Sequence, residues 1–291
     1  MLDPVARIRR FNRAVTREVG ALDTSFLGRG RPLGAARVLW AVSPDGSDLS
    51  EIRAALGLDS GLMSRLLRRL EREGLVTTQK DGADRRSRIV RLTAAGVAER
   101  AAYDRLNNDM ASGLLTRMSR NAEALLDAMD LIANALDRAR ITVGPVDPEA
   151  PEARACLAAY FDLLTARIPG ISAAHVPLPD PDAGLFRAPL GAFLIARADG
   201  ATLGCVSLKP IDSDIGEIKR LWVAPSARGL GLARRLMAEA ETVARNLGKS
   251  RLILDTNENL PEAIALYRSD GWKDIAAYSG FPATHWFEKS L

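Results

Sequence analysis

A glycine-rich segment, Ser226-Ala-Arg-Gly-Leu-Gly-Leu-Ala233, is the part of the sequence best suited to hold a charged ligand. It follows a short run of β-branched and aromatic residues that Pro225 ends, which predicts a strand. After it, apolar residues recur at three- and four-residue spacing, which predicts a helix. The first N–H groups of a helix lack intrahelical partners, and Gly229 and Gly231 let a ligand approach the backbone closely. The segment therefore predicts a phosphate-binding turn, with a simple strand-to-helix connection as the alternative.

Of three known phosphate-binding patterns, the turn fits one. A P-loop needs Gly-Lys-Ser/Thr, whereas Leu232 and Ala233 follow Gly231 here. A Rossmann fingerprint needs a third small residue at the position that Arg234 occupies. The remaining pattern, Arg228-Gly-Leu-Gly-Leu-Ala233, resembles the Q/R-x-x-G-x-G/A signature of the GNAT superfamily of acyl-CoA-dependent N-acetyltransferases.

The resemblance to GNAT enzymes implies that acetyl-CoA is the co-substrate and that no metal ion is needed. The backbone of Leu221, Trp222 and Val223 is expected to pair with the pantetheine arm and orient the thioester. The N–H groups of the turn are expected to cradle the pyrophosphate. The candidates there are Arg228, Gly229, Leu230, Gly231, Leu232, Ala233 and Arg234. Many GNAT members also place an asparagine where this chain has Leu260, so the nearby Asn259 is the candidate for that cofactor contact.

Acetylation of an amine also needs groups that move protons. A neutral amine must attack the thioester, so a base or a water relay takes a proton, and the leaving thiolate benefits from a nearby acid. By resemblance, Glu217 is the expected general base; a strand carboxylate paired with Lys219 or Arg220 is the alternative. Tyr267, in the segment Pro-Glu-Ala-Ile-Ala-Leu-Tyr, matches the tyrosine that GNAT enzymes place beside the CoA sulfur. It is the expected general acid, and a core tyrosine is the alternative.

An α/β domain with a mixed sheet is predicted to position these residues. The expected elements are a helix over 152–168, paired strands over 193–197 and 203–209, the strand, turn and helix around the glycines, a strand over 251–256, a helix over 261–270 and a strand near 285–288. This order resembles the GNAT fold over about residues 150–291.

Basic residues gather in a second region, residues 60–91, where nine stand against four acidic ones. Such a stripe is a candidate footprint for a phosphate backbone, although a solvated face has the same composition. Helices predicted over 49–56 and about 60–73 form a helix-turn-helix in outline. The second has one apolar face and one face of hydroxyl and guanidinium groups, as a recognition helix in a major groove requires. Ser60, Ser64 and Arg65 are the candidates for base edges, and Arg68, Arg69 and Arg72 for phosphates.

A predicted hairpin with a polar tip follows this helix. The arginines of the tip, Arg85, Arg86 and Arg88, are candidates for the adjacent minor groove. The stretch LEREGLVTTQKDGADRRSRIVRLTAAG resembles the winged helix-turn-helix of the MarR family, and the resemblance covers about residues 5–140. It implies binding to double-stranded DNA and a homodimer of interleaved helices, here 5–22 and 93–139. A monomeric core closed by those helices is the alternative.

The length of 291 residues suits two domains. We expect a MarR-like DNA-binding and dimerisation domain over 1–143, a linker over 144–151 with three prolines, and a GNAT domain over 152–291. The fold class is then α+β multidomain: an α-rich winged helix-turn-helix domain followed by an α/β GNAT fold with a mixed central sheet. The charge divides unevenly, with 24 basic against 18 acidic residues over 1–143 and 16 against 18 over the rest.

Composition places the chain among soluble globular proteins, with 47% hydrophobic and 26% charged residues. The sequence shows no signal peptide and no apolar run long enough to span a bilayer, so a cytoplasmic protein is expected. Cys156 and Cys205 lack partners for a disulfide framework or metal cluster and are expected to pack as small hydrophobes.

The leading hypothesis is a bifunctional protein. It predicts a transcriptional regulator that also transfers an acetyl group from acetyl-CoA to a primary amine of a small molecule. A MarR-type transcription factor whose GNAT domain senses acyl-CoA without turnover is the competing hypothesis. A winged helix that serves only for dimerisation is the third.

Overall fold

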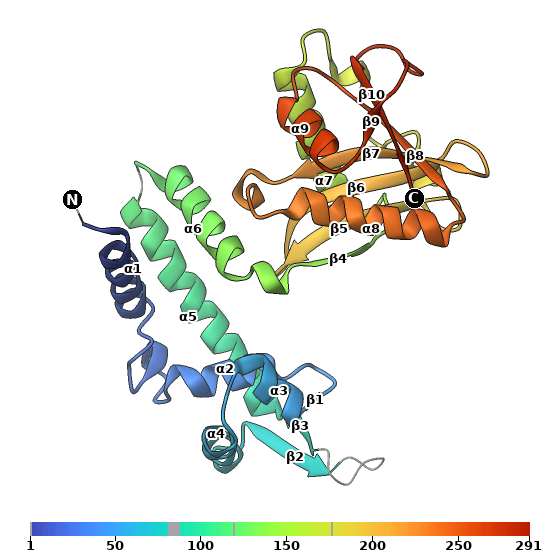
Figure 1. Ribbon diagram of the computed structural model, residues 1–291. Coiled ribbons are helices and arrows are strands. Elements are labelled where there is room, and N and C mark those ends of the chain that lie inside the picture. The colour runs from blue at the N-terminus through green and yellow to red at the C-terminus, as the bar shows by residue number, and fades with distance from the viewer. Residues whose placement is uncertain (1, 81–87, 119, 176) are drawn as a thin grey trace. The chain divides into compact units, whose positions relative to one another are not determined.

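The computed structural model of the chain describes residues 2–80, 88–118, 120–175 and 177–291 (Figure 1). It divides into two compact units, Met1–Arg120 and Asn121–Leu291. Each unit has its own hydrophobic core. No cluster of the described residues contains buried members from both units, as is typical of separately packed domains.

Helices and a small antiparallel sheet form the first unit. In chain order they are α1 (Pro4–Glu18), η1 (Phe26–Gly28), α2 (Leu33–Ala41), β1 (Ser47–Asp48), α3 (Leu49–Leu56), α4 (Ser60–Arg72), β2 (Val76–Lys80), β3 (Arg88–Leu92) and α5 (Ala94–Met118). The strands lie in the order β1-β3-β2. The pair α3 and α4 followed by the β2–β3 hairpin is the order that the sequence predicted for a winged helix-turn-helix.

Short polar residues and a glycine set the ends of α3 and α4. Asp48 accepts hydrogen bonds from the N–H groups of Ser50 and Glu51 at the start of α3, and Gly57 ends that helix with a φ of 64°. Asp59 accepts from the N–H of Leu62, at 2.8 Å, at the start of α4. Side-chain oxygens and a left-handed glycine at these positions satisfy backbone groups that a helix end leaves free. The turn between the helices is therefore fixed locally.

One face of α4 is buried in the core of the first unit. Its buried residues are Met63, Leu66, Leu67 and Leu70. They join a cluster that includes Leu39 of α2 and Tyr103 of α5. The predicted apolar face of this helix is confirmed, and burying it leaves the arginine-rich face directed away from the core.

A seven-stranded mixed sheet forms the centre of the second unit, in the order β4-β5-β6-β7-β8-β10-β9. The elements are α6 (Ala122–Leu136), η2 (Arg138–Arg140), β4 (Thr142–Pro145), α7 (Pro151–Arg167), η3 (Ala173–His175), η4 (Ala183–Phe186), β5 (Ala192–Ala198), β6 (Ala201–Pro210), β7 (Ile215–Val223), η5 (Pro225–Ala227), α8 (Leu232–Asn246), β8 (Arg251–Thr256), α9 (Pro261–Ser269), β9 (Lys273–Asp274) and β10 (His285–Ser290). Neighbouring strands are antiparallel except β7 and β8, which are parallel. The predicted α/β fold with a mixed sheet is confirmed.

The two faces of this sheet carry separate apolar clusters. Along β5, Leu194 belongs to the cluster that includes Leu236 and Met237 of α8. Its neighbour Phe193 belongs to the cluster that includes Leu157 of α7. Successive strand residues point to opposite faces, so α8 covers one face of the sheet and α7 covers the other. Figure 1 shows α8 lying against one side of the sheet.

The division between the units differs from the boundary expected at residues 144–151. Residues 142–145 form β4, which pairs with β5 as an edge of the second sheet. The prolines do not prevent this, because an edge strand tolerates a residue without an N–H donor. Helix α6, which the sequence assigned to the first domain, belongs to the second unit. The segment 144–151 is therefore not a free spacer between the units.

Two smaller expectations concern the cysteines and membranes. Cys156 and Cys205 are free and buried in the α7 side of the core, as predicted. Within the described parts of the chain, no helix has the length and apolar character needed to cross a bilayer.

Candidate active site

The glycine turn joins the end of β7 to α8. Gly229 and Gly231 have φ angles of 75° and 78°, where residues with a Cβ are strained. None of the N–H groups of residues 229–234 donates a hydrogen bond to a described residue, and the N-cap of α8 has no side-chain cap. These free donors lie at the positive end of the α8 dipole, so the turn can bind an anionic group such as a phosphate.

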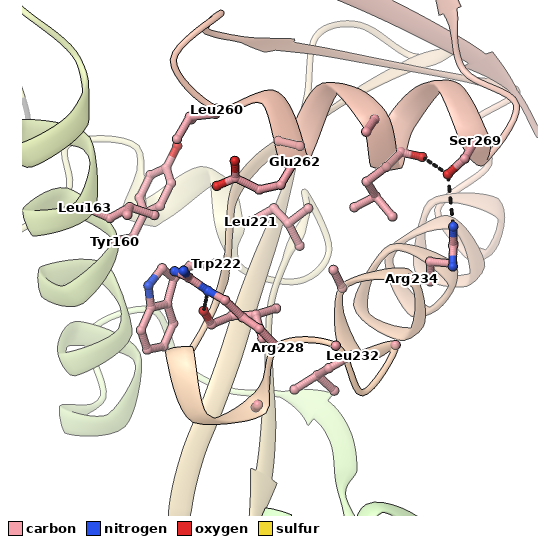
Figure 2. Close-up of a pocket in the computed structure, with 18 of the residues that line it drawn as sticks. Tyr160, Leu163, Leu221, Trp222, Arg228, Leu232, Arg234, Leu260, Glu262 and Ser269 are labelled. Atoms are coloured by element: carbon pink, nitrogen blue, oxygen red, sulfur yellow. Dashed lines mark hydrogen bonds between the residues drawn. The ribbon is translucent and has the colours of Figure 1, made fainter. Parts of the chain in front are cut away.

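A cavity of about 820 Å³, here called the large cavity, lies at this turn. Figure 2 shows side chains from β7 (Leu221), α8 (Arg234) and α9 (Glu262) around it. The lining residues are Arg138, Tyr160, Leu163, Leu221, Trp222, Val223, Ala227, Arg228, Gly229, Gly231, Leu232, Ala233, Arg234, Leu260, Glu262, Ala263, Ala265, Leu266 and Ser269. The predicted cofactor residues all line this cavity except Leu230 and Asn259.

The charged groups of the large cavity are mainly arginines. Arg228 donates to the carbonyl of Val223 at 3.3 Å, and Arg234 donates to Oγ of Ser269 at 3.0 Å. The carboxylate of Glu262 is paired with the guanidinium of Arg167. Among the described lining residues, Glu262 is the one carboxylate, and its charge is balanced by Arg167. The guanidinium groups and the free N–H donors therefore suit a ligand that carries several phosphates.

A bulge in β7 shapes the wall of the cavity. The register between β6 and β7 shifts between Cys205 and Ser207, and Arg220 takes a φ of 58° in the left-handed region. Such a conformation is costly for a residue with a Cβ and persists where surrounding contacts fix it. Arg220 is fixed by Asp180, whose Oδ2 accepts from its Nε at 2.8 Å, and by the ring of Phe161, 5.3 Å from Cζ.

Beyond the bulge, β7 has an open edge. It pairs with β8 only over residues 215–217, so the two strands separate before Leu221. Residues 221–223 therefore offer backbone groups that no strand of the described chain occupies on that side. A ligand with amide groups, such as the pantetheine arm of CoA, can pair with such an edge.

A second cavity of about 160 Å³, here called the small cavity, adjoins the large one. The two share four lining residues, Tyr160, Leu221, Leu260 and Ala263. The other residues of the small cavity are Leu164, Ile168, Ile171, His175, Ile218, Lys219, Arg220, Asp255, Thr256, Asn257, Tyr267, Pro282 and Ala283. The shared residues mark the place where a ligand in one cavity meets a ligand in the other.

Tyr267, the expected general acid, lines the small cavity. It is buried, and its hydroxyl makes no hydrogen bond to a described residue. Burial raises its pKa above the usual value of a tyrosine, so the phenol keeps its proton at neutral pH. A protonated hydroxyl free to donate into a cavity is what a general acid requires.

Glu217, the expected general base, lies outside the lining of both cavities. Its carboxylate is buried and lies 2.8 Å from Nζ of Lys219 and 3.5 Å from Nζ of Lys209. The hydroxyl of Tyr278 also donates to it, at 3.1 Å. Two ammonium groups and a hydroxyl thus surround this carboxylate inside the protein. The geometry therefore favours the alternative interpretation, a paired strand carboxylate, over direct contact with the reacting amine.

Asp255, at the end of β8, is the carboxylate that does line the small cavity. Its Oδ1 lies 2.9 Å from Nζ of Lys219, and its Oδ2 accepts from Oγ of Ser279 at 2.7 Å. Burial acts to lower the pKa of Lys219, but Asp255 and Glu217 outweigh it and hold that pKa above its usual value. The ammonium group stays charged and links the two carboxylates.

Asn259 is not among the residues that line the large cavity, and the cofactor contact expected of it stays a prediction. Its N–H and its side-chain amide both donate to Oδ1 of Asn257, at 2.9 Å and 2.8 Å. Asn257 in turn donates to the carbonyl of Pro282 and lines the small cavity. The two asparagines thus fix the loop between β8 and α9.

Several lining residues were not found from the sequence. Those on α9, Glu262, Ala265, Leu266 and Ser269, recur at helical spacing, and that period could have marked them as one face. Arg138, Tyr160 and Asp255 belong to three distant segments and have no local pattern that connects them. His175 lines the small cavity, but its Nδ1 is 3.0 Å from Oγ of Ser172.

Most of the α4 residues that the sequence predicted to contact DNA are exposed, and one is not. Ser60, Ser64, Arg65, Arg68 and Arg72 of α4 are exposed. None of these residues belongs to the apolar cluster of the unit. Their contact with DNA stays a prediction.

The exception is Arg69, which is occupied within its own unit. Its Nε donates to Glu73 at 2.9 Å, and a terminal nitrogen donates to the carbonyl of Gly30 at 2.7 Å. A phosphate contact by Arg69 would have to replace these two bonds, and it stays a prediction. Arg85 and Arg86 lie outside the described residues, and Arg88 is exposed at the start of β3.

Comparison with known proteins agrees with this organisation. A family model described as the acetyltransferase (GNAT) family matches residues 159–272, and one described as the MarR family matches residues 29–87. The two resemblances stated from the sequence are confirmed, because each matched segment lies within the half of the chain assigned to it.

Curated relatives are similar to part of the chain. The IAA acetyltransferase of Azospirillum brasilense is 39% identical over 104 residues, which cover 34% of this chain and 67% of that protein. An uncharacterized N-acetyltransferase of Schizosaccharomyces pombe is 40% identical over 92 residues, covering 31% and 56%. The uncharacterized N-acetyltransferase YjgM of Escherichia coli is 34% identical over 94 residues, covering 31% and 56%. The chain thus spans little more than half the length of two of these relatives.

Proposed function

Because the chain belongs to the acetyltransferase (GNAT) family, we propose that it transfers an acetyl group from acetyl-CoA to a primary amine of a small molecule. Its MarR family region is proposed to bind double-stranded DNA and to form a homodimer. The protein is then a bifunctional enzyme and transcriptional regulator of the cytoplasm, where acetyl-CoA and DNA are both present.

The observation that carries the enzymatic proposal is the junction of the two cavities at the open edge of β7. The large cavity has free N–H donors and arginines for phosphates at one end. The small cavity has a phenol and a carboxylate. A thioester lying along residues 221–223 has its carbonyl carbon near Leu221, which both cavities share. An amine in the small cavity can attack that carbon.

The proposed reaction needs two proton movements. The acceptor leaves its ammonium proton in solvent as it enters, so that a neutral amine nitrogen forms the bond to the carbonyl carbon. That nitrogen then loses its second proton to Asp255, directly or through water. The tetrahedral intermediate then collapses, the C–S bond breaks, and the thiolate takes the proton of Tyr267. Solvent returns a proton to the phenolate and removes one from Asp255. The products are an amide and CoA, and both side chains are back in their starting protonation states.

The size and charge of the small cavity limit the acceptor. A space of about 160 Å³ suits a compact amine rather than a protein loop. Arg220 is ion-paired with Asp180, and Lys219 is ion-paired with Glu217 and Asp255. These two cations therefore line the cavity as polar groups whose charges are already balanced. A small cationic amine that meets Asp255 is the acceptor class that this wall favours.

The DNA-binding proposal rests on the exposed arginines of α4 and on the MarR family match. Exposed guanidinium groups on a helix whose opposite face is buried are positioned to meet phosphates on both sides of a groove.

Release of the CoA thiol against a panel of small primary amines tests the enzymatic proposal. Saturable thiol release with at least one amine, and a product heavier by one acetyl group, is the expected result. Tight binding of acetyl-CoA without release for any amine would instead favour an acyl-CoA sensor. The same assay with and without DNA shows whether one function alters the other.

A further inference from the structure

The segment just before the GNAT-matching residues reaches the large cavity. Residues 159–272 match the family, but α6 and η2, at 122–140, lie before that region and belong to the same compact unit. Helix α6 packs against η5, the short helix immediately before the glycine turn. An element outside the matched region is thus in contact with the phosphate-binding part of the site.

Asn134 holds this contact. It is a buried residue on a helix whose other residues are largely exposed. Its Nδ2 lies 3.2 Å from the carbonyl oxygen of Ser226 and 3.2 Å from its Oγ. Ser226 is two residues before Arg228, where the turn begins. A buried side-chain amide with both bonds directed to one residue fixes the position of that residue relative to α6.

Arg138, one turn beyond Asn134, lines the large cavity. A Cβ added to Gly231 would lie 3.3 Å from a terminal nitrogen of its guanidinium, so this group lies directly beside the turn. Within the described residues it makes no ion pair or hydrogen bond, unlike its neighbour Arg140, which is paired with Asp137 at 3.8 Å. A guanidinium beside six unused N–H groups has no protein partner there and is free to meet a ligand.

We propose that Arg138 binds a phosphate group of acetyl-CoA and that Asn134 is a positioning residue that holds α6 against the turn. The proposal rests on acetyl-CoA as the co-substrate. Acetyl-CoA carries a pyrophosphate and a 3′-phosphate, and a guanidinium binds either as a paired donor. The segment before the GNAT-matching region is then part of the cofactor site, and cofactor binding stabilises its contact with the turn.

Calorimetric titration of the full chain with CoA tests this role of Arg138. Arg138→Ala is expected to raise the Kd by about tenfold. Arg140→Ala removes the same charge from the same short helix, outside the cavity lining, and should leave the Kd within about twofold. Equal affinities of Arg138→Ala and the wild type would overturn the proposal.

Titration with 3′-dephospho-CoA identifies the phosphate. If the effect of Arg138→Ala disappears with this ligand, the 3′-phosphate is the partner; if it persists, the pyrophosphate is. A wild-type chain that binds no CoA would overturn the proposed function together with this inference. Normal CoA binding that ignores Arg138 would overturn the inference alone.

Steady-state kinetics separate the positioning role of Asn134 from a general loss of folding. Asn134→Ala is expected to raise KM for acetyl-CoA several-fold with kcat nearly unchanged at saturation. Ser226→Ala removes the hydroxyl acceptor but keeps the carbonyl acceptor, so it should raise KM less than Asn134→Ala does. Thermal melts of both variants show whether either one is unfolded. A drop in kcat with an unchanged KM would contradict this role of Asn134.

Discussion

In the proposed reaction, two side chains of the small cavity have opposite tasks. Tyr267 is buried and makes no hydrogen bond to a residue that the structure describes, and its raised pKa keeps it protonated. Asp255 lines the same cavity and shares Lys219 with Glu217. One group can therefore give a proton and the other can take one without either being displaced from its contacts.

Replacing Tyr267 by phenylalanine removes the acid and keeps the ring. We expect kcat to fall by about 100-fold, because the thiolate then leaves without a proton donor, while KM for acetyl-CoA changes little. Because the pKa of Tyr267 is raised above the usual value of a tyrosine, its hydroxyl stays protonated up to about pH 10. Deprotonation of Tyr267 should therefore not lower the wild-type kcat between pH 7 and about pH 10. A pH profile of kcat for both proteins measures this. Unchanged kcat in the variant would leave Tyr267 as a core residue.

Comparing Asp255→Asn with Glu217→Gln separates the two carboxylates. Asp255→Asn should lower kcat by about 100-fold, since it removes the carboxylate that lines the cavity. Glu217→Gln should lower kcat less than about tenfold and instead reduce the free energy of unfolding by about 2 kcal/mol, because a buried ion pair is broken while each lysine keeps another carboxylate. Kinetics and chemical denaturation of both variants give the two quantities. The reverse order of kcat effects would restore Glu217 as the base.

The sequence predicted those parts of the site whose residues are close together in the chain. The turn residues 228–234 are contiguous, so their spacing alone predicted a phosphate site, and most of them line the large cavity. Asp255 and Tyr160 are far apart in the sequence, and only the folded sheet brings them together. Glu217 was predicted as the base by family position, and its pairing with Lys219, two residues along the same strand, was the alternative. Its contact with Lys209 depends on strand register, which one sequence does not reveal.

At the scale of elements, α4 combines a buried face with an exposed basic one. The period of its leucines allowed that division to be predicted, because the helical repeat fixes which residues share a face. The hydrogen bond from Arg69 to the carbonyl of Gly30 could not be predicted, since Gly30 is far away in the sequence.

Removing the exposed arginines of α4 should weaken DNA binding. We expect Arg65→Ala and Arg68→Ala each to lower the affinity for a target duplex. The slope of log affinity against log salt should also fall by about 0.9 for every phosphate that the variant no longer binds. Arg105→Ala, which removes an exposed arginine of α5, is the charge-matched control and should change neither. Fluorescence anisotropy at several salt concentrations provides both values. Variants that bind like the control would exclude α4 as the recognition helix.

Edge strands and short elements were the part of the fold that the sequence did not reveal. β4 and β9 have four and two residues, too few for a periodic pattern. The proline-rich character of 144–151 predicted a spacer, and pairing of residues 142–145 with β5 overrode it. Longer elements such as α7, β5 and β6 were predicted because their patterns extend over several turns or alternations.

At the scale of the whole molecule, α1 is a helix with an apolar stripe and no buried residue. Val5, Ile8, Phe11 and Val15 on it are all exposed. Four large apolar residues at helical spacing in water are costly, and a second copy of the chain would cover them. This stripe supports the proposed homodimer.

A charge on that stripe should separate the subunits. Ile8→Glu is expected to shift the protein from dimer to monomer at micromolar concentration, because a carboxylate in an apolar interface is desolvated without a partner. Ala14→Glu adds the same charge to another face of α1 and should remain dimeric. Analytical ultracentrifugation of the three proteins measures the state. A wild-type monomer, or a dimer that tolerates Ile8→Glu, would contradict this role of the stripe.

The contact of α6 with the glycine turn also affects where recombination could join the two halves of such a protein. A crossover near residue 150 would join a new regulator to a catalytic half that lacks Asn134, Arg138 and β4. A crossover near residue 120 would transfer them together. Recombination that keeps the site intact should therefore transfer α6 together with the acetyltransferase half, although the segment just before α6 belongs to the regulator half.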